Sequence, residues 1–419
     1  MDELISRLLA HDRVRTARRH IERTDERTLA LQAELSAIPA PTGAEGARAA
    51  RTAELFREAG LSDVTIDEAG NVTGWMIGEG GKGKGEGGEP VVLSAHLDTV
   101  FGPEVSVRVE RRGRRLEGPG IADNARGLAA LVGVARATVE ARVPVARPVL
   151  FAATVGEEGQ GNLRGMRFLL NGRPTPHVPR LRQPHAVIAL DGAGVERVVH
   201  RALGSRRYRA TYRGPGGHSW AAFGVANPAN AVGRAAAVLA DLPTPHPKGL
   251  PDGRAPRTTC SVVRLGGGTG LNSIPQEAWI DLDLRSEERE ALAQLDDTVR
   301  AALERAADDE NRRRAAGTPP LRLDLQLVGD RPSGVTPRTH PLVQSAVAAT
   351  RALGRAHELA CASTDANVPI ALGIPAIALG AGGRAGDAHL PTEWYENTDG
   401  ALGLIRAMLV TLAMTELTA

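Results

Sequence analysis

Four short, almost uninterrupted runs of apolar residues constrain the fold of this 419-residue chain more than any other feature. They cover residues 91–95, 149–155, 186–190 and 376–380. Runs without polar alternation are typical of strands buried on both faces, as in a sheet with helices on either side. A helical stretch over 125–141 lies between the first two runs, which is the rhythm of an α/β protein. We therefore predict an α/β fold with a helix-flanked mixed sheet.

The segment over residues 203–329 has a different pattern and predicts a second, inserted domain. Its expected elements are a strand, an Ala-rich helix over 227–241, two strands flanking a glycine-rich turn, a long charged helix and an alternating strand. This β-α-β-β-α-β order is that of a ferredoxin-like α+β unit. Residues 1–202 and 330–419 would then form one discontinuous α/β domain.

Charge and cysteine content exclude several classes of protein. With Lys+Arg at 51 and Asp+Glu at 49, the net charge of +2 argues against a nucleic-acid or membrane partner. Cys260 and Cys361 lie outside any CxxC pair, so we expect no disulfide scaffold and a reducing compartment. The N-terminus has no apolar signal region and no apolar window could span a membrane, so we expect a cytoplasmic protein.

The glycine-rich segment 78–90 is expected to be a flexible loop between two strands.

Ionisable side chains follow all four apolar runs, where the carboxyl ends of the strands are expected. They are His96 and Asp98 after the first run, Glu157 and Glu158 after the second, Asp191 after the third, His389 in the loop after the fourth, and Asp123 in a glycine-rich turn that opens the intervening helix. Ligands of open α/β sheets bind at these strand ends. Each residue alone more often has a structural role, but so many unpaired carboxylates would repel one another. Divalent cations are the simplest compensation, so this set predicts a metal site.

The motifs around these residues resemble the M20 family of dizinc metallopeptidases. They are His96-Leu97-Asp98-Thr99-Val100, Gly118-Pro119-Gly120 with Asp123-Asn124, Gly156-Glu157-Glu158-Gly159 and Asp387-Ala388-His389. The resemblance covers nearly the whole chain and includes Gly217-His218-Ser219 in the predicted insertion. The family includes peptidase T, carboxypeptidases, and deacylases of acetylornithine and succinyl-diaminopimelate. Residues 38–43 and 161–165 are most similar to the peptidase T-like branch.

The resemblance implies a dinuclear metal centre. One ion would be bound by His96, Asp123 and Asp191, and the other by Asp123, Glu158 and His389, with Asp123 bridging. Zinc suits these nitrogen and oxygen donors, and manganese or cobalt are alternatives. The family pattern also implies a cis peptide bond between Asp123 and Asn124.

The chemistry and the resemblance together suggest roles for two more acidic residues. Asp98 would fix the tautomer of His96. Glu157 would act as the base, which takes a proton from a metal-activated water and hands it to the leaving amine.

Three residues of the predicted insertion match further family positions. The resemblance implies that His218 reaches across a homodimer, formed through the inserted domain, to the scissile carbonyl. Asn272 and Arg285 would contact the substrate, with Arg285 binding a carboxylate. A solvated loop histidine and a structural salt bridge are the alternatives for His218 and Arg285. An exposed sheet edge in this domain would favour pairing with a second chain.

We therefore expect a metal-dependent hydrolase that cleaves an amide bond in small peptides. An aminopeptidase acting on di- and tripeptides is the first choice. An N-acyl amino-acid deacylase or a carboxypeptidase of the same family is the alternative, because selectivity depends on pocket shape. A non-catalytic binding protein on this fold is the alternative from a different class. It is disfavoured because Glu157 and all five ligand positions are present.

Overall fold

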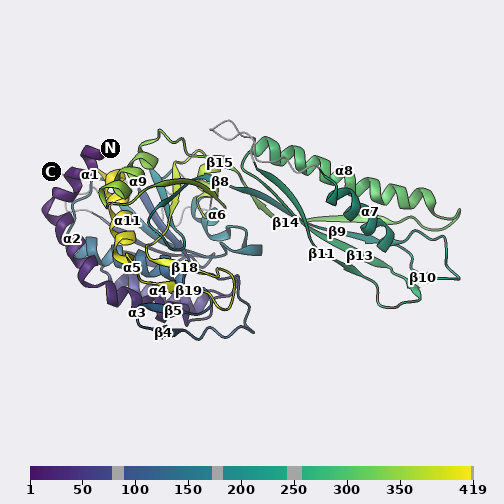
Figure 1. The fold of residues 1–419 in the computed structure, drawn as a ribbon, viewed down its shortest axis with the longest axis horizontal. Helices are drawn as coiled ribbons and strands as arrows, with labels where there is room; N and C mark the ends of the chain where they lie inside the picture. Colours follow the sequence, from purple (N-terminus) through teal and green to yellow (C-terminus); the bar gives the residue numbers. More distant parts are fainter. Residues whose placement is uncertain (78–88, 172–182, 243–256, 417–419) are drawn as a thin grey trace. The chain divides into compact units, whose positions relative to one another are not determined.

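The four apolar runs form neighbouring strands at the centre of one sheet (Figure 1). These strands are β6 (Val149–Thr154), β3 (Val91–His96), β7 (Ala186–Leu190) and β17 (Ala376–Leu379), in this spatial order. Each pairs with its neighbour in parallel. The computed structural model describes residues 1–77, 89–171, 183–242 and 257–416, so most of the loop predicted at 78–90 lies outside the described residues.

Antiparallel strands complete this sheet, which makes it mixed as predicted. Its full order is β1-β2-β6-β3-β7-β17-β8-β15, and β16 pairs with β8. Strand β2 runs antiparallel to β6, and β8 runs antiparallel to β17. The bounds of the added strands are β1 (Ser62–Ile66), β2 (Val72–Met76), β8 (Arg197–Ala202), β15 (Gly334–Val335) and β16 (Glu358–Ala362).

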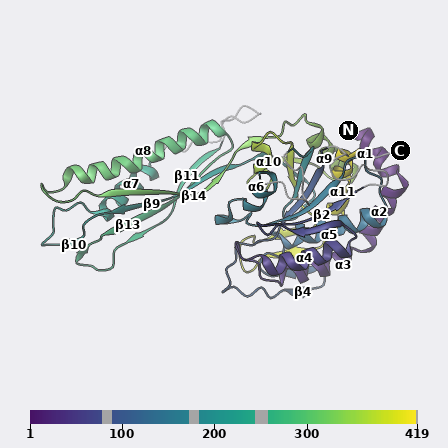
Figure 2. The same cartoon turned by 180° about the vertical axis from the view of Figure 1, so that it is seen from behind.

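Successive side chains of the central strands enter two hydrophobic cores, which explains why their sequences do not alternate with polar residues. Val91 and Leu93 lie in the larger core, whereas Val92 lies in the smaller one. Helices α5 and α11 cover the face of the sheet that borders the larger core, and α6 and α10 cover the face that borders the smaller core (Figures 1 and 2). The helices are α1 (Asp2–Ala10), α2 (Asp12–Arg23), α3 (Asp25–Ser36), α4 (Gly46–Glu58), α5 (Ala125–Glu140), α6 (Arg164–Asn171), α9 (Pro341–Ala352), α10 (Asn367–Ala371) and α11 (Gly400–Thr415).

A small four-stranded sheet brings together two segments that are far apart in the sequence. Its order is β18-β19-β5-β4, with β4 (Glu110–Arg112), β5 (Arg115–Glu117), β18 (Arg384–Gly386) and β19 (Trp394–Glu396). The loop between β18 and β19 carries His389, and Asp123 follows β5 shortly along the chain. The pairing of β19 with β5 therefore places these two segments side by side.

The chain divides into two compact units. Unit 1 comprises Met1–Ala202 and Val335–Ala419, and unit 2 comprises Leu203–Gly334. The predicted end of the insertion at residue 329 falls inside strand β14, which continues to Arg331. No helix among the described residues is both long enough and apolar enough to cross a lipid bilayer.

Unit 2 has the expected ferredoxin-like order of elements. They are β9 (Gly204–Arg213), α7 (Pro228–Ala240), β11 (Thr258–Gly267), β13 (Glu277–Ser286), α8 (Arg289–Arg313) and β14 (Arg322–Arg331), and the antiparallel sheet order is β11-β13-β9-β14. Tyr208 and Ile280 pack in the core with α7 and α8, while Arg209 and Asp281 lie on the opposite face of the sheet and pair with each other. A two-stranded ribbon of β10 (Gly217–His218) and β12 (Ser273–Ile274) completes the unit.

Buried arginines hold the loops of unit 1 through backbone carbonyls. Arg406 of α11 is fully buried and donates to the carbonyl oxygens of Val195, Arg197 and Gly380. Burial lowers the pKa of Arg406 to about 10, so the guanidinium still carries its charge at neutral pH. It therefore joins the segment before β8 to the segment after β17.

Replacing this guanidinium tests its contribution to stability. We expect Arg406→Met to lower the free energy of unfolding by at least about 2 kcal/mol, because buried carbonyls lose their donors. Urea unfolding followed by circular dichroism measures the change. Arg18→Met is the control, because Arg18 forms an exposed pair with Glu22 within one helix, and such pairs contribute about 0.5 kcal/mol or less. Equal effects of the two variants would contradict this role for Arg406.

Candidate metal centre

The parallel pairing of β6, β3 and β7 gathers ionisable side chains at one edge of the sheet. Strand β3 ends at His96, Glu157 and Glu158 follow the end of β6, and Asp191 directly follows β7. His96 is paired in register with Thr154, the last residue of β6. The side chains after these strands therefore emerge next to one another, as the sequence predicted.

Five of the predicted residues form two groups that share Asp123. In the first group, Nε2 of His96 lies 3.0 Å from Oδ1 of Asp123 and 4.0 Å from Oδ1 of Asp191. In the second group, Nε2 of His389 lies 3.2 Å from both Oδ2 of Asp123 and Oε1 of Glu158. Within each group the potential ligand atoms lie within 4.8 Å of one another. The two oxygens of Asp123 thus face two different histidines, the geometry expected of a bridging carboxylate.

The turn that carries Asp123 is held from two sides. The peptide bond between Asp123 and Asn124 is cis, which confirms the expectation. Asn124 caps α5 by accepting from the amide of Gly127 and donates to the carbonyl of Leu190, the residue before Asp191. Asn124 therefore joins the turn to the end of β7.

Glu393 is a buried residue of this centre that the sequence analysis missed. Its carboxylate accepts hydrogen bonds from the amides of Ala122 at 2.7 Å and Asp123 at 2.9 Å. Glu393 lies shortly after His389, so it attaches the loop of one candidate ligand to the turn of another. Burial raises its pKa, although the amides it binds oppose that effect. No local pattern marks it, because its partners lie about 270 residues away in the sequence.

Protons on the histidines balance the carboxylates in this arrangement. Hydrogen bonds with Asp123 and Glu158 raise the pKa of His389 to about 10. Burial and the negative charge of Asp123 raise the pKa of Asp191 to about 7. Burial alone would raise the pKa of Asp123, but the two histidines hold it well below its usual value. The donor set is therefore rich in negative charge and imidazole nitrogen, and divalent cations could replace the protons.

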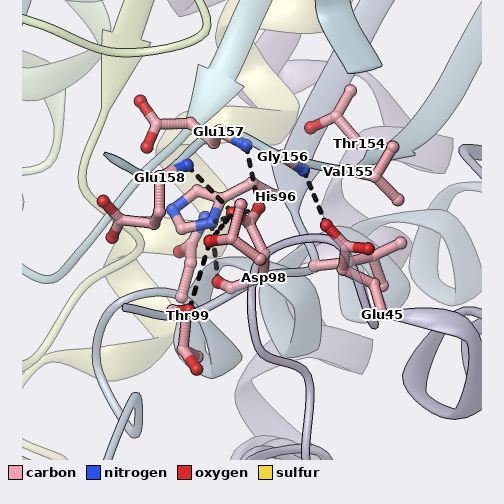
Figure 3. Close-up of polar contacts among 12 residues, drawn as sticks. Glu45, His96, Asp98, Thr99, Thr154, Val155, Gly156, Glu157 and Glu158 are labelled. Carbon is pink, nitrogen blue, oxygen red and sulfur yellow. Dashed lines mark hydrogen bonds and ion pairs between the residues drawn. The ribbon is translucent and has the colours of Figure 1, made fainter. Parts of the chain in front are cut away.

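Asp98 lies beside His96, and its carboxylate has further partners. Nδ1 of His96 lies 3.0 Å from the backbone oxygen of Asp98 and 3.6 Å from its carboxylate. The carboxylate accepts from the amides of Glu157 and Glu158, each at 2.9 Å (Figure 3). It also accepts from the hydroxyl of Thr42. The nearest polar contact of Nδ1 is therefore the peptide oxygen of Asp98, while the carboxylate of Asp98 also supports the segment after β6.

Glu157 and Glu158 are both buried, and they differ in their neighbours. Glu158 belongs to the group with Asp123 and His389, whereas Glu157 has a carboxylate oxygen within 4.8 Å of ligand atoms of His96 and Glu158. A cavity of about 430 Å³ borders Glu158. It is lined by Thr42, Gly43, Thr99, Val100, Phe101, Gly102, Gly159, Gln160, Gly161 and Arg164 as well. A small molecule could thus reach this edge of the sheet.

The other predicted residues lie in unit 2. His218 is exposed on β10, where Nδ1 accepts from the amide of Trp220 at 3.3 Å. Asn272 is close to it, because the amide of Ser219 donates to the carbonyl of Asn272. The guanidinium of Arg285 donates to Asp283 of the same strand at 2.9 Å, which is the salt bridge considered as its alternative role.

Comparisons with solved structures agree with this architecture. An aminopeptidase PepT from Bacillus cereus is 22% identical, with a TM-score of 0.68 over 93% of this chain and 98% of that chain. A tripeptidase from Staphylococcus aureus is 20% identical, with a TM-score of 0.70 over 93% and 97%. The YXEP protein of Bacillus subtilis, described as a dinuclear metal binding peptidase from the M20 family, is 15% identical, with a TM-score of 0.63 over 94% and 98%. At these identities the likeness establishes the fold.

The sequence itself establishes the family. No curated protein matches it significantly. The family model for "Peptidase family M20/M25/M40", however, matches residues 92–414. This match spans most of the chain, including every candidate residue described above, and it confirms the resemblance inferred from the motifs. The chain is therefore an enzyme that belongs to peptidase family M20/M25/M40.

Proposed function

We propose that this protein is an aminopeptidase that hydrolyses di- and tripeptides with the help of two divalent metal ions. The observation that carries the proposal is the pair of histidine–carboxylate groups that share Asp123, with the carboxylate of Glu157 beside them. The similarity to an aminopeptidase and a tripeptidase supports the choice of substrate.

We assign the five ligand-type residues to two metal ions. His96, Asp123 and Asp191 would hold one ion, and Asp123, Glu158 and His389 the other. Zinc is the first choice for this nitrogen and oxygen set, with manganese or cobalt as alternatives. When bound, such ions polarise the amide carbonyl and lower the pKa of water to near neutrality.

Glu157 is the proposed general base. It is buried beside the candidate ligands, within 4.8 Å of ligand atoms of His96 and Glu158, and it is not a member of the two groups that share Asp123. It would accept the proton of the attacking water and deliver it to the nitrogen of the leaving amine. Asp98 would hold the backbone from which Glu157 projects.

Unit 2 provides the proposed contacts with the substrate. Exposed His218, next to Asn272, would donate a hydrogen bond to the scissile carbonyl in the site of a second subunit. Asn272 would contact the substrate, and Arg285 would bind its carboxylate in competition with Asp283.

A panel of substrates tests the reaction type. We expect metal-loaded enzyme to hydrolyse Leu-Gly-Gly and a dipeptide, and to be much slower on their N-acetylated forms, because an aminopeptidase requires a free amino group. Faster hydrolysis of N-acetyl or N-succinyl amino acids would identify the deacylase alternative. Release of the C-terminal residue from the N-acetylated peptides would identify the carboxypeptidase.

Metal removal is a direct test of the centre. Chelation should abolish hydrolysis, and restoring zinc should recover it together with about two bound ions per chain, measured by atomic emission. Because His389 has a pKa of about 10 without metal, binding must displace its proton. The apparent affinity for zinc should therefore fall between about pH 8 and about pH 6. Full activity in metal-free protein, or an affinity independent of pH, would contradict the proposed centre.

The neighbouring glutamates should respond differently to the same substitution. Glu157→Gln should keep both ions and lower kcat by roughly 10²- to 10⁴-fold, because the proton acceptor is lost. Glu158→Gln should lose bound metal as well as activity. Steady-state kinetics with metal analysis separates the two results. A normal kcat in Glu157→Gln would assign the base to another residue.

Complementation tests the proposed role of His218 in a dimer. Glu157→Gln and His218→Ala should each be inactive as homodimers. Mixed under conditions that allow subunit exchange, they should recover part of the activity, because one site of each heterodimer has both native groups. Exchange is verified with two differently tagged chains. Verified exchange without recovered activity, or a monomer at assay concentration, would refute a shared site.

A further inference from the structure

We propose that Glu45 is a positioning residue, whose buried carboxylate fixes the backbone that carries Glu157 and Glu158. This inference rests on the proposed function, since it concerns the placement of the proposed base and of one proposed metal ligand. Glu45 lies just before α4, far from both glutamates in the sequence. It contacts the backbone of Gly156, the residue directly before Glu157.

Four consecutive amides after β6 donate to side chains from other parts of the chain. The amide of Gly156 donates to Glu45, and those of Glu157 and Glu158 donate to Asp98, at 2.9–3.0 Å (Figure 3). The amide of Val155 donates to Asn71 at 3.0 Å. Three side chains thus hold the whole segment 155–158. We call this set of hydrogen bonds the amide clamp.

The clamp replaces the hydrogen bonds that regular structure would provide. Strand β6 ends at Thr154 and the next helical turn begins at Gly159, so residues 155–158 have neither a strand nor a helix partner for their amides. All four residues are buried, and buried amides without acceptors are strongly unfavourable. Gly156 has a φ of +63°, so the chain bends immediately before Glu157. A bend of this kind needs external contacts to have one conformation.

Glu45 is well suited to hold this bend. Its side chain is buried, and the same oxygen, Oε1, accepts from the amides of Gly156 at 3.0 Å and Gly43 at 2.9 Å. The guanidinium of Arg164, 3.4 Å away, balances its charge. Arg164 follows the clamped segment, and its own amide donates to the carbonyl of Gly156. Gly156 is therefore fixed through both its N–H and its C=O.

The residue held by Glu45, Gly156, directly precedes the two proposed functional residues, Glu157 and Glu158. Asp98 binds the amides of Glu157 and Glu158, and Thr42, close to Glu45 in the sequence, donates to the same carboxylate of Asp98. The loop 42–45 thus supports the segment 156–158 in two ways, directly through Glu45 and indirectly through the bond from Thr42 to Asp98. Loss of Glu45 would free the bend at Gly156 and let Glu157 shift, and a shift of about 1 Å in a catalytic group can cost about 10²-fold in rate.

Kinetics of metal-loaded variants test the inference. We expect Glu45→Ala to lower kcat on Leu-Gly-Gly by roughly 10- to 100-fold, with KM changed less than about twofold and both metals retained. Glu45→Gln should recover most of the activity, because its amide oxygen can still accept from Gly156 and Gly43. Glu54→Ala is the matched control, since Glu54 lies on the adjoining helix α4 with an exposed side chain and should leave kcat unchanged.

Hydrogen exchange tests the clamp without relying on activity. In Glu45→Ala, amide exchange measured by mass spectrometry should accelerate in the peptide that covers residues 155–158, while the peptides of β3 and α5 exchange as in the native protein. If the wild-type protein hydrolyses no peptide, the proposed function fails. The exchange measurement still shows whether Glu45 holds residues 155–158 in place. Unchanged exchange and kcat in Glu45→Ala would overturn the inference. So would accelerated exchange throughout unit 1 without rescue by Glu45→Gln.

Discussion

The parallel pairing of β6, β3 and β7 determines where the chemistry of this chain can occur. Parallel strands end together, so the polar residues after each strand meet at one edge although they come from distant parts of the sequence. The apolar side chains of the same strands are buried in two cores, which hold the strands that carry this edge. Asp123 and His389 reach the edge from a helix start and a loop, through the pairing of β5 with β19. The candidate metal centre is thus a product of sheet topology.

Buried charged side chains hold the loops at this edge through the backbone. Arg48 donates to the carbonyls of Ile38 and Leu97. Arg406 donates to the carbonyls of Arg197, at the start of β8, and of Gly380, directly after β17. The carboxylates of Glu45 and Glu393 instead accept hydrogen bonds from backbone amides. Loops cannot satisfy their own polar groups as helices and sheets do, so a buried loop needs such partners. A site that places many ionisable groups on loops therefore depends on a second set of buried charges behind it.

Local patterns in the sequence predicted most of the fold. The apolar runs identified the four central strands, and the element order of unit 2 was found as expected, because both depend on short-range periodicity. Strand β14 continues past the predicted end at residue 329, after an irregularity in its pairing with β9 between Leu327 and Gly329.

The residues that gather at the metal centre were recognised because each stands beside a strand end or in a distinctive motif. Glu45 and Glu393 were not recognised, and the partners of the Asp98 carboxylate were not foreseen. Their hydrogen bonds join segments about 60 to 270 residues apart, and a carboxylate that binds backbone amides leaves no mark on the sequence of its partner.

The place of unit 2 in the sequence has a consequence for the pairing of strands in unit 1. Strands β8 and β15, which precede and follow most of unit 2 along the chain, are hydrogen-bonded neighbours in the sheet of unit 1. Neighbouring strands lie about 4.8 Å apart, a gap that a short turn can bridge. The sheet of unit 1 is therefore continuous without the inserted residues. The chain therefore leaves unit 1 and returns to it between two neighbouring strands, so a change in the length of unit 2 need not alter the pairing of the strands of that sheet.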